Sequence, residues 1–164
     1  MFILDLHEIE NWIENLIFYL LQEKEFKMIT KEEKNKEAVR KAIDAFNRQD
    51  IEAYWSYHTE DTTSHEVYFA EPLTKEEMSK FVPQLWHSYP DWYIETKNMV
   101  ASDDMVAVEN VMSATFVNDD GDIKATGKKF SVREGVFFEM EDGKIKHVRV
   151  YLDRKSQEEQ LGLA

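Results

Sequence analysis

The sequence predicts an α+β domain in which helices come first and an antiparallel sheet follows. Two observations carry this prediction. Apolar residues recur at helical spacing in the first half of the chain, whereas after Pro90 they alternate with polar residues. Short turns rich in Asp and Gly separate the alternating runs, as in β-hairpins. With 164 residues, 43% of them hydrophobic, the chain has enough apolar material for one core.

An amphipathic helix is expected within residues 5–26, because apolar residues lie there at helical spacing. We therefore expect an N-terminal helical extension over residues 1–28 and a main domain over residues 29–164. The apolar stripe is broad and includes Trp12 and Phe18. The helix would pack either on its own domain or on a partner subunit. Alternatively, Met28 is the natural start and the segment is peripheral to function.

Capping-box spacing marks the start of two further helices. Thr30 and Glu33 open one that should end near residue 50, and Thr74 and Glu77 open another. Pro83 lies inside the latter and should kink or divide it. Between them we expect a short helix near residues 51–55 and a short strand over residues 62–68.

The second half predicts four strands, over residues 92–101, 105–117, 123–140 and 144–153, followed by a short helix over residues 156–163. The long middle strands should bend, with a bulge at Gly127 or Gly135. A long bent meander with helices on its concave side forms a cone that encloses a pocket. Ligand sites favour such concave, mostly apolar places.

Composition argues against several function classes. The net charge of −13 repels phosphate backbones and anionic lipid, so neither nucleic acid nor a membrane is expected as a partner. The chain has no cysteine, and its five histidines are too scattered for a metal site, so we expect no metal and no cofactor. The start lacks the features of a secretory signal, and the apolar run at residues 16–21 is too short to span a bilayer. A cytoplasmic location is expected.

Four segments of the chain follow one another in an order that is typical of a known family. They are AFNRQDIEAY at residues 45–54, where the helix that starts near Thr30 ends, YPDW at residues 89–92, TGKKFSVREGVFFEMEDGKI at residues 126–145 and YLDRKSQEEQLGL at residues 151–163. From Asn35 to the end, the chain thereby resembles the SnoaL-like polyketide cyclases of the nuclear transport factor 2-like superfamily, which has a cystatin-like fold. The resemblance covers about four-fifths of the chain and leaves out residues 1–28.

The resemblance implies a cone-shaped domain with an internal pocket. In the cyclases, an aspartate just before the C-terminal helix acts as acid and base in a metal-free intramolecular aldol closure, and Asp153 matches that position. The alternative for Asp153 is that it only ends the strand and caps the last helix. Members of the superfamily often pair through the outer sheet face, so a homodimer is expected, with Val148, Val150 and Leu152 in need of cover.

Three further polar or charged residues belong with Asp153 to the expected site. Strand alternation places Arg149 and Tyr151 beside Asp153, where they either line the cavity and bind substrate or form a solvated polar face. His65 is the best candidate for a second catalytic residue, because a neutral imidazole can shuttle protons near pH 7; it would otherwise belong to a polar edge. Asp153 and His65 are therefore the expected catalytic residues.

Two aromatic residues, Trp55 and Trp86, are expected at the cavity mouth as substrate-binding residues. The arginine and aspartate of a limonene-epoxide-hydrolase-like triad are absent from the matching segment, residues 109–112. Glu134 could supply a second carboxylate, although Arg133 and Glu134 should point to opposite faces.

The expected function is a small-molecule-binding, cofactor-free enzyme of the cyclase or isomerase kind that acts on a hydrophobic carbonyl compound. The alternative is a ligand-binding or dimeric interaction module of the same fold without turnover. The sequence identifies neither the substrate nor the polar residues that face the pocket.

Overall fold

A computed structural model describes residues 11–17, 30–66 and 69–164. The chain divides into two compact units, residues 1–30 and residues 31–164. In the first unit, residues 11–17 are helical and expose the apolar side chains of Trp12, Ile13, Leu16 and Ile17. The rest of the helix expected over residues 5–26 lies outside the described residues.

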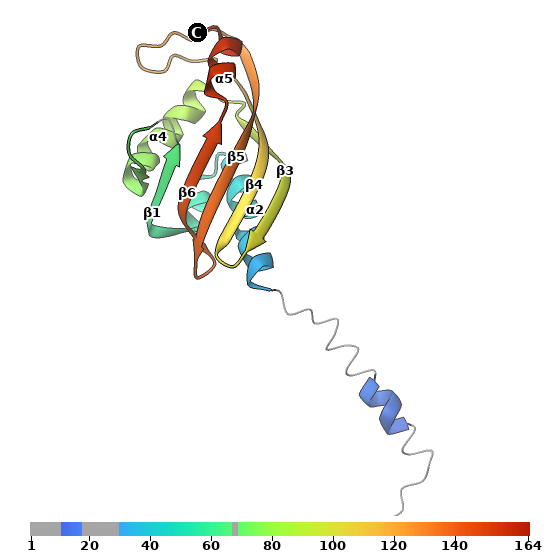
Figure 1. Ribbon diagram of the computed structural model, residues 1–164. Helices are drawn as coiled ribbons and strands as arrows, with labels where there is room; N and C mark the ends of the chain where they lie inside the picture. Colours follow the sequence, from blue (N-terminus) through green and yellow to red (C-terminus); the bar gives the residue numbers. More distant parts are fainter. Residues whose placement is uncertain (1–10, 18–29, 67–68) are drawn as a thin grey trace, which may run out of the picture. The chain divides into compact units, whose positions relative to one another are not determined.

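The second unit is an α+β domain, as predicted, and is built on one six-stranded sheet (Figure 1). The sheet order is β2-β1-β6-β5-β4-β3. The strands are β1 (His58–Glu66), β2 (Leu73–Thr74), β3 (Tyr93–Ser102), β4 (Met105–Thr115), β5 (Lys129–Glu141) and β6 (Lys144–Leu152). The helices of this unit are α2 (Lys31–Asn47), α3 (Ile51–Ser56), α4 (Lys75–Ser88) and α5 (Arg154–Leu161).

Strict alternation of burial defines the two faces of the sheet. Every second residue of β4 and of β5 is buried, beginning with Val106 and Phe130 respectively. These residues form the core with the apolar side of α2, which includes Val39, Ala42 and Ile43. The inner face of the sheet is therefore the one that the helices cover.

The sheet is less uniform than the predicted meander. β1 runs parallel to β6, so that its C-terminal half lies beside residues 147–150. Gly135 keeps regular pairing with Glu109 and Tyr151, and the irregularity of β5 instead falls between Glu139 and Met140. The predicted bulge is therefore displaced toward the β5–β6 turn.

The strand predicted over residues 123–140 begins only at residue 129, because side-chain contacts hold the preceding segment as a loop. The Asp119 carboxylate accepts a hydrogen bond from the Ala125 N–H at 2.8 Å and pairs with Lys124 at 2.7 Å. Gly127 then takes a positive φ of 66°, a conformation that glycine adopts without steric cost. This loop and α5 lie at the same end of the domain (Figure 1).

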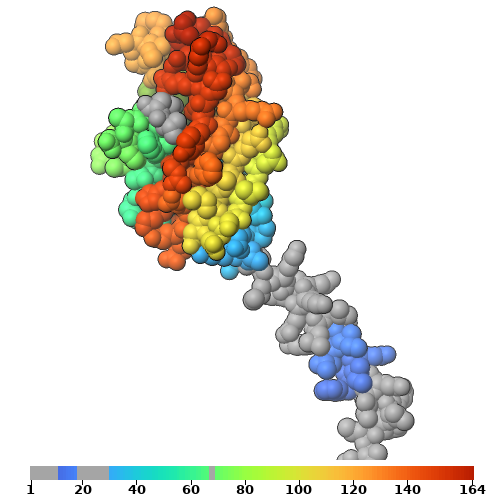
Figure 2. All heavy atoms as spheres, viewed as in Figure 1, coloured from blue at the N-terminus to red at the C-terminus, as the bar shows by residue number. Residues whose placement is uncertain are grey.

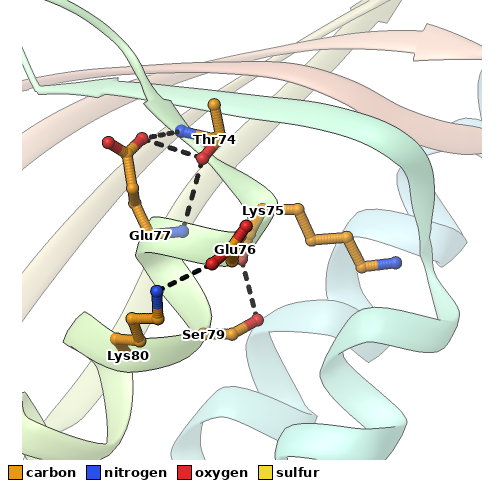
Figure 3. A network of polar contacts seen from close by, with 6 residues as sticks. All are labelled: Thr74, Lys75, Glu76, Glu77, Ser79 and Lys80. Carbon is orange, nitrogen blue, oxygen red and sulfur yellow. Dashed lines mark hydrogen bonds and ion pairs between the residues drawn. The ribbon is translucent and has the colours of Figure 1, made fainter.

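A capping box starts α4, as the sequence predicts. The Thr74 hydroxyl accepts from the Glu77 N–H at 3.3 Å, and the Thr74 N–H donates to the Glu77 carboxylate at 2.8 Å (Figure 3). The helix continues through Pro83 to Ser88, so the proline does not divide it. The helix buries Met78, Val82 and Trp86 against the domain.

The outer face of the sheet carries no helix of residues 31–164 over β5 and β6 (Figures 1 and 2). The side chains of Phe137 and Tyr151 are 40% and 46% exposed there and lie edge to face, with ring centroids 5.9 Å apart. Val148, Val150 and Leu152, which were expected to need cover on this face, lie on the inner face instead. None of the described helices is long and apolar enough to cross a membrane.

Candidate functional site

A cavity of about 630 Å³ lies between the inner face of the sheet and the helices. Its walls are mostly apolar and aromatic, and include Phe46, Met78, Phe81, Tyr89, Trp92, Met112, Val136, Phe138, Val148 and Leu152. Its volume lies within the usual range of small-molecule sites. Chemistry in such a cavity depends on its few polar residues.

Glu66 reaches the cavity from the last residue of β1. Ser64, two residues earlier, also lines the cavity, as strand alternation requires. Burial in apolar surroundings and the nearby Glu134 raise the pKa of Glu66 to about 7, although the Arg154 charge lowers it. A carboxyl group with this pKa exchanges a proton readily at neutral pH.

Glu134 and Asn110 form a buried polar pair on the adjacent strands β5 and β4. The Asn110 amide donates to the Glu134 carboxylate at 2.9 Å, and the two residues are 1% and 7% exposed. Burial raises the pKa of Glu134, which the Asn110 hydrogen bond partly offsets. The Asn110 amide oxygen is buried and has no hydrogen-bond partner in the described part of the chain.

Tyr54 of α3 completes the polar lining on the helix side. Its ring packs edge to face on Phe46 and Trp55, at 5.4 and 4.7 Å between centroids. Burial and the nearby charge of Glu66 raise its pKa well above the ordinary value. The phenol therefore stays protonated and is a hydrogen-bond donor at any physiological pH.

His58 is buried beside Tyr54 but does not line the cavity. Its Nδ1 donates to the Tyr54 carbonyl oxygen at 2.9 Å, and burial lowers its pKa to about 4. The imidazole is therefore neutral at pH 7. It fixes the backbone of Tyr54 and so helps to position that side chain.

The polarity of the lining increases toward α5 and the β4–β5 loop, where Asp120, Arg154 and Glu158 join it. Arg154 binds Glu158 at 2.7 Å, and these side chains are 49% and 39% exposed. These charged side chains of the lining are therefore partly exposed to solvent.

The two predicted catalytic residues lie elsewhere. Asp153 is exposed and caps α5, where its carboxylate accepts from the Ser156 N–H at 3.0 Å, so the buried setting expected for it is not present. His65 alternates with the cavity residues Ser64 and Glu66 and therefore points away from the cavity. Its Nε2 donates to the Phe69 carbonyl oxygen at 3.1 Å.

The four predicted substrate-binding residues also lie outside the cavity lining. Arg149 and Tyr151 are on the outer face, where Arg149 pairs with Glu139, because their neighbours on β6 are the ones that face inward. Trp55 and Trp86 each lie behind an aromatic residue that lines the cavity. Trp55 packs on Tyr54, and Trp86 packs on Phe46 at 5.1 Å.

Sequence reasoning missed Glu66, Asn110 and Tyr54 and discounted Glu134. A signal for two of them was present: Glu134 is the one polar residue in the inward row of β5, and Asn110 is the one in that of β4. The rows read Phe130, Val132, Glu134, Val136, Phe138 and Val106, Val108, Asn110, Met112, Ala114. Glu66 and Tyr54 lack such a signal: the pairing of β1 with β6 places Glu66, and the packing of α3 on Phe46 of α2 places Tyr54. Within the described ranges, no three His, Asp or Glu side chains are grouped as metal ligands.

Residues 36–161 match the sequence model of a family described as SnoaL-like polyketide cyclase. No curated protein matches the chain. Among solved structures, AclR, a proposed hydroxylase from Streptomyces galilaeus, superposes with a TM-score of 0.71 at 20% identity, over 79% of this chain and 85% of AclR. IdmH, a proposed polyketide cyclase from Streptomyces antibioticus, gives 0.69 at 20% identity, over 78% and 98%. An LEH-like epoxide hydrolase from M. tuberculosis gives 0.67 at 14% identity, over 80% of this chain and 92% of that protein.

Proposed function

Since the chain belongs to the SnoaL-like polyketide cyclase family, we propose that it is an enzyme of the cyclase or isomerase kind that moves a proton on an apolar carbonyl compound. Glu66 is the acid and base of this proposal. The observation that supports it is the position of this carboxyl group, which lies on an apolar cavity wall that raises its pKa to about 7. A base with a pKa near the working pH transfers protons most effectively.

The proposed reaction begins when the Glu66 carboxylate takes a proton from the carbon next to the substrate carbonyl. An enolate forms as the C–H bond breaks, and its negative charge gathers on the oxygen. The protonated phenol of Tyr54, which lines the same cavity from the helix side, is a donor that can hydrogen-bond this oxygen. In an isomerisation, protonated Glu66 then returns the proton at another carbon of the enolate. In a cyclisation, the enolate carbon first forms a C–C bond to a second carbonyl carbon of the same substrate, the π bond of that carbonyl breaks to give an alkoxide, and Glu66 returns the proton to the alkoxide oxygen.

The test measures proton abstraction directly, because the natural substrate is unidentified. The protein is incubated with 2-tetralone, an apolar bicyclic ketone, in D₂O at pH 7, and deuterium incorporation beside the carbonyl is followed by NMR. The wild type should exceed the uncatalysed rate. Glu66→Gln should lose at least tenfold of that excess, since general acid–base catalysis contributes about 100- to 10,000-fold.

Asp153→Asn is the matched control, because it removes a carboxylate that caps a helix outside the cavity. It should keep wild-type exchange. If Asp153→Asn loses exchange and Glu66→Gln keeps it, the acid/base is the residue indicated by the family resemblance, and our assignment is overturned.

The alternative function is a ligand-binding module without turnover. The largely apolar cavity supports it equally well on shape alone. Saturable binding of 2-tetralone without accelerated exchange in the wild type would favour this alternative.

We also propose that the protein is a homodimer that pairs through the outer sheet face. The exposed aromatic pair Phe137 and Tyr151 supports this, because large apolar side chains at the centre of a sheet face are commonly covered in an assembly.

A further inference from the structure

Three polar side chains of the cavity lining present hydrogen-bond acceptors, beside the donor phenol of Tyr54. Glu66 and Glu134 each present a carboxyl group, and the Asn110 amide oxygen is buried without a partner in the described residues. The Asn110 NH₂ group is already engaged by Glu134. A bound molecule can satisfy these acceptors only if it brings its own donors.

The charges in the cavity lining also favour a ligand that brings hydrogen-bond donors. Arg154 is the one described cation in the lining; it is half-exposed and is bound to Glu158. Glu134 forms no ion pair with a described residue, and its hydrogen-bond donor is the uncharged amide of Asn110. Two carboxyl groups in an apolar site are stabilised in their charged forms by a cation that enters with the ligand.

We propose that the cavity binds an apolar amine in its protonated form, with the ammonium group held by Glu134 and the Asn110 amide oxygen. An ammonium group has donors for both of these acceptors and neutralises one negative charge, whereas a hydroxyl group donates one bond and leaves the charge. The aromatic walls, which include Phe46, Tyr54 and Trp92, suit both the hydrocarbon part and the cation. The net charge of −13 favours approach of a cation.

This inference rests on the proposed function and narrows its substrate from an apolar carbonyl compound to one that also carries an amine. Glu134 and Asn110 would hold the amine, which leaves Glu66 free to move the proton. Binding of the amine does not itself require turnover, so the two proposals can be tested separately.

The test compares two ligands with the same bicyclic skeleton, 2-aminotetralin and the neutral 2-tetralol, by isothermal titration calorimetry at pH 8. Wild type should bind the amine at least tenfold more tightly than the alcohol. Glu134→Gln keeps an acceptor for the Asn110 amide but removes the charge, and it should reduce this preference to within about twofold.

Glu109→Gln is the matched control. Glu109 precedes Asn110 on β4 and points to the opposite face, where it pairs with Arg133, so the substitution removes the same charge from the sheet outside the cavity. The amine preference should persist in this variant. Circular dichroism and thermal unfolding check that both variants are folded.

The pH dependence of wild-type binding provides a test that needs no substitution. Burial raises the pKa of both cavity glutamates, to about 7 for Glu66, so Glu66 is protonated at pH 5 and charged at pH 8. Affinity for 2-aminotetralin should therefore increase from pH 5 to pH 8, with protons released to the buffer, whereas affinity for 2-tetralol should not increase. The other titratable groups of the lining are Tyr54, Tyr89, Asp120, Arg154 and Glu158.

The inference is overturned if wild type binds the amine no more tightly than the alcohol, or if Glu134→Gln keeps the preference. If Glu109→Gln also loses the preference for the amine, the preference arises from the net charge of the protein, and the proposed ammonium site at Glu134 and Asn110 is overturned. Deuterium exchange into 2-tetralone without amine preference leaves the proposed function standing and removes only this inference. Amine preference without exchange removes the proposed function and leaves the ligand site.

Discussion

The buried carboxyl groups make the stability of this protein depend on pH. Glu66 has a pKa of about 7 in the folded protein, against a value near 4.5 when exposed. Between these two values the folded state binds more protons than the unfolded state, so stability decreases as pH rises through this window. Below pH 4.5 both states are protonated at Glu66 and its contribution is constant.

Glu66→Gln should remove this dependence, since glutamine does not titrate. We expect the wild type to lose about 1–3 kcal/mol more stability than Glu66→Gln between pH 5 and pH 8, a range below the full effect of the shift because Glu66 is only half-buried. Urea unfolding of both proteins at the two pH values measures the difference. Parallel pH profiles for the two proteins would contradict the buried setting of Glu66.

At the scale of single elements, β6 shows that a shift of one residue along a strand decides which side chains line the cavity. Val148, Val150 and Leu152 face the cavity, so Arg149 and Tyr151 cannot. The prediction assumed that the polar set faced inward because Asp153 continues it. The apolar set faces inward because the core behind the cavity removes its surface from water.

The capping box of α4 gives a prediction at the same scale. Thr74→Ala removes the hydroxyl that accepts from the Glu77 N–H, and it should destabilise the domain by about 1 kcal/mol (Figure 3). Thermal unfolding measures the effect. Lys80→Ala is the control, because its exposed pair with Glu76 contributes little, and it should shift the midpoint less than Thr74→Ala.

At the scale of the whole molecule, the two faces of the sheet differ in what covers them. The inner face holds the cavity, and the outer face presents Phe137 and Tyr151 to its surroundings. The N-terminal segment adds further exposed apolar side chains, among them Trp12. These surfaces are the two candidates for subunit association.

Phe137→Lys should convert the proposed dimer to a monomer, because it places a charge at the centre of the outer face. Sedimentation equilibrium at micromolar concentration measures the association, and the fold is checked by circular dichroism. A monomeric wild type would contradict the dimer. Deletion of residues 1–27 in the same experiment separates the two surfaces: weaker association in the deletion alone would assign the contact to the N-terminal helix.

The sequence by itself determined the fold class, the order of most elements and the family. Helical spacing, capping boxes and strand alternation are local patterns, and local sequence specifies them. The same patterns were enough to place the core rows of β4 and β5, in which Asn110 and Glu134 are the polar exceptions.

Only the tertiary structure decided which residues form the site. Glu66 meets the cavity because β1 pairs in parallel with β6, a contact between residues about 80 positions apart that no local pattern specifies. Asp153 is a helix cap because α5 begins directly after it and its backbone N–H groups need an acceptor. Burial by distant elements gives Glu66 its unusual pKa, and that burial exists only once the sheet and helices have packed together.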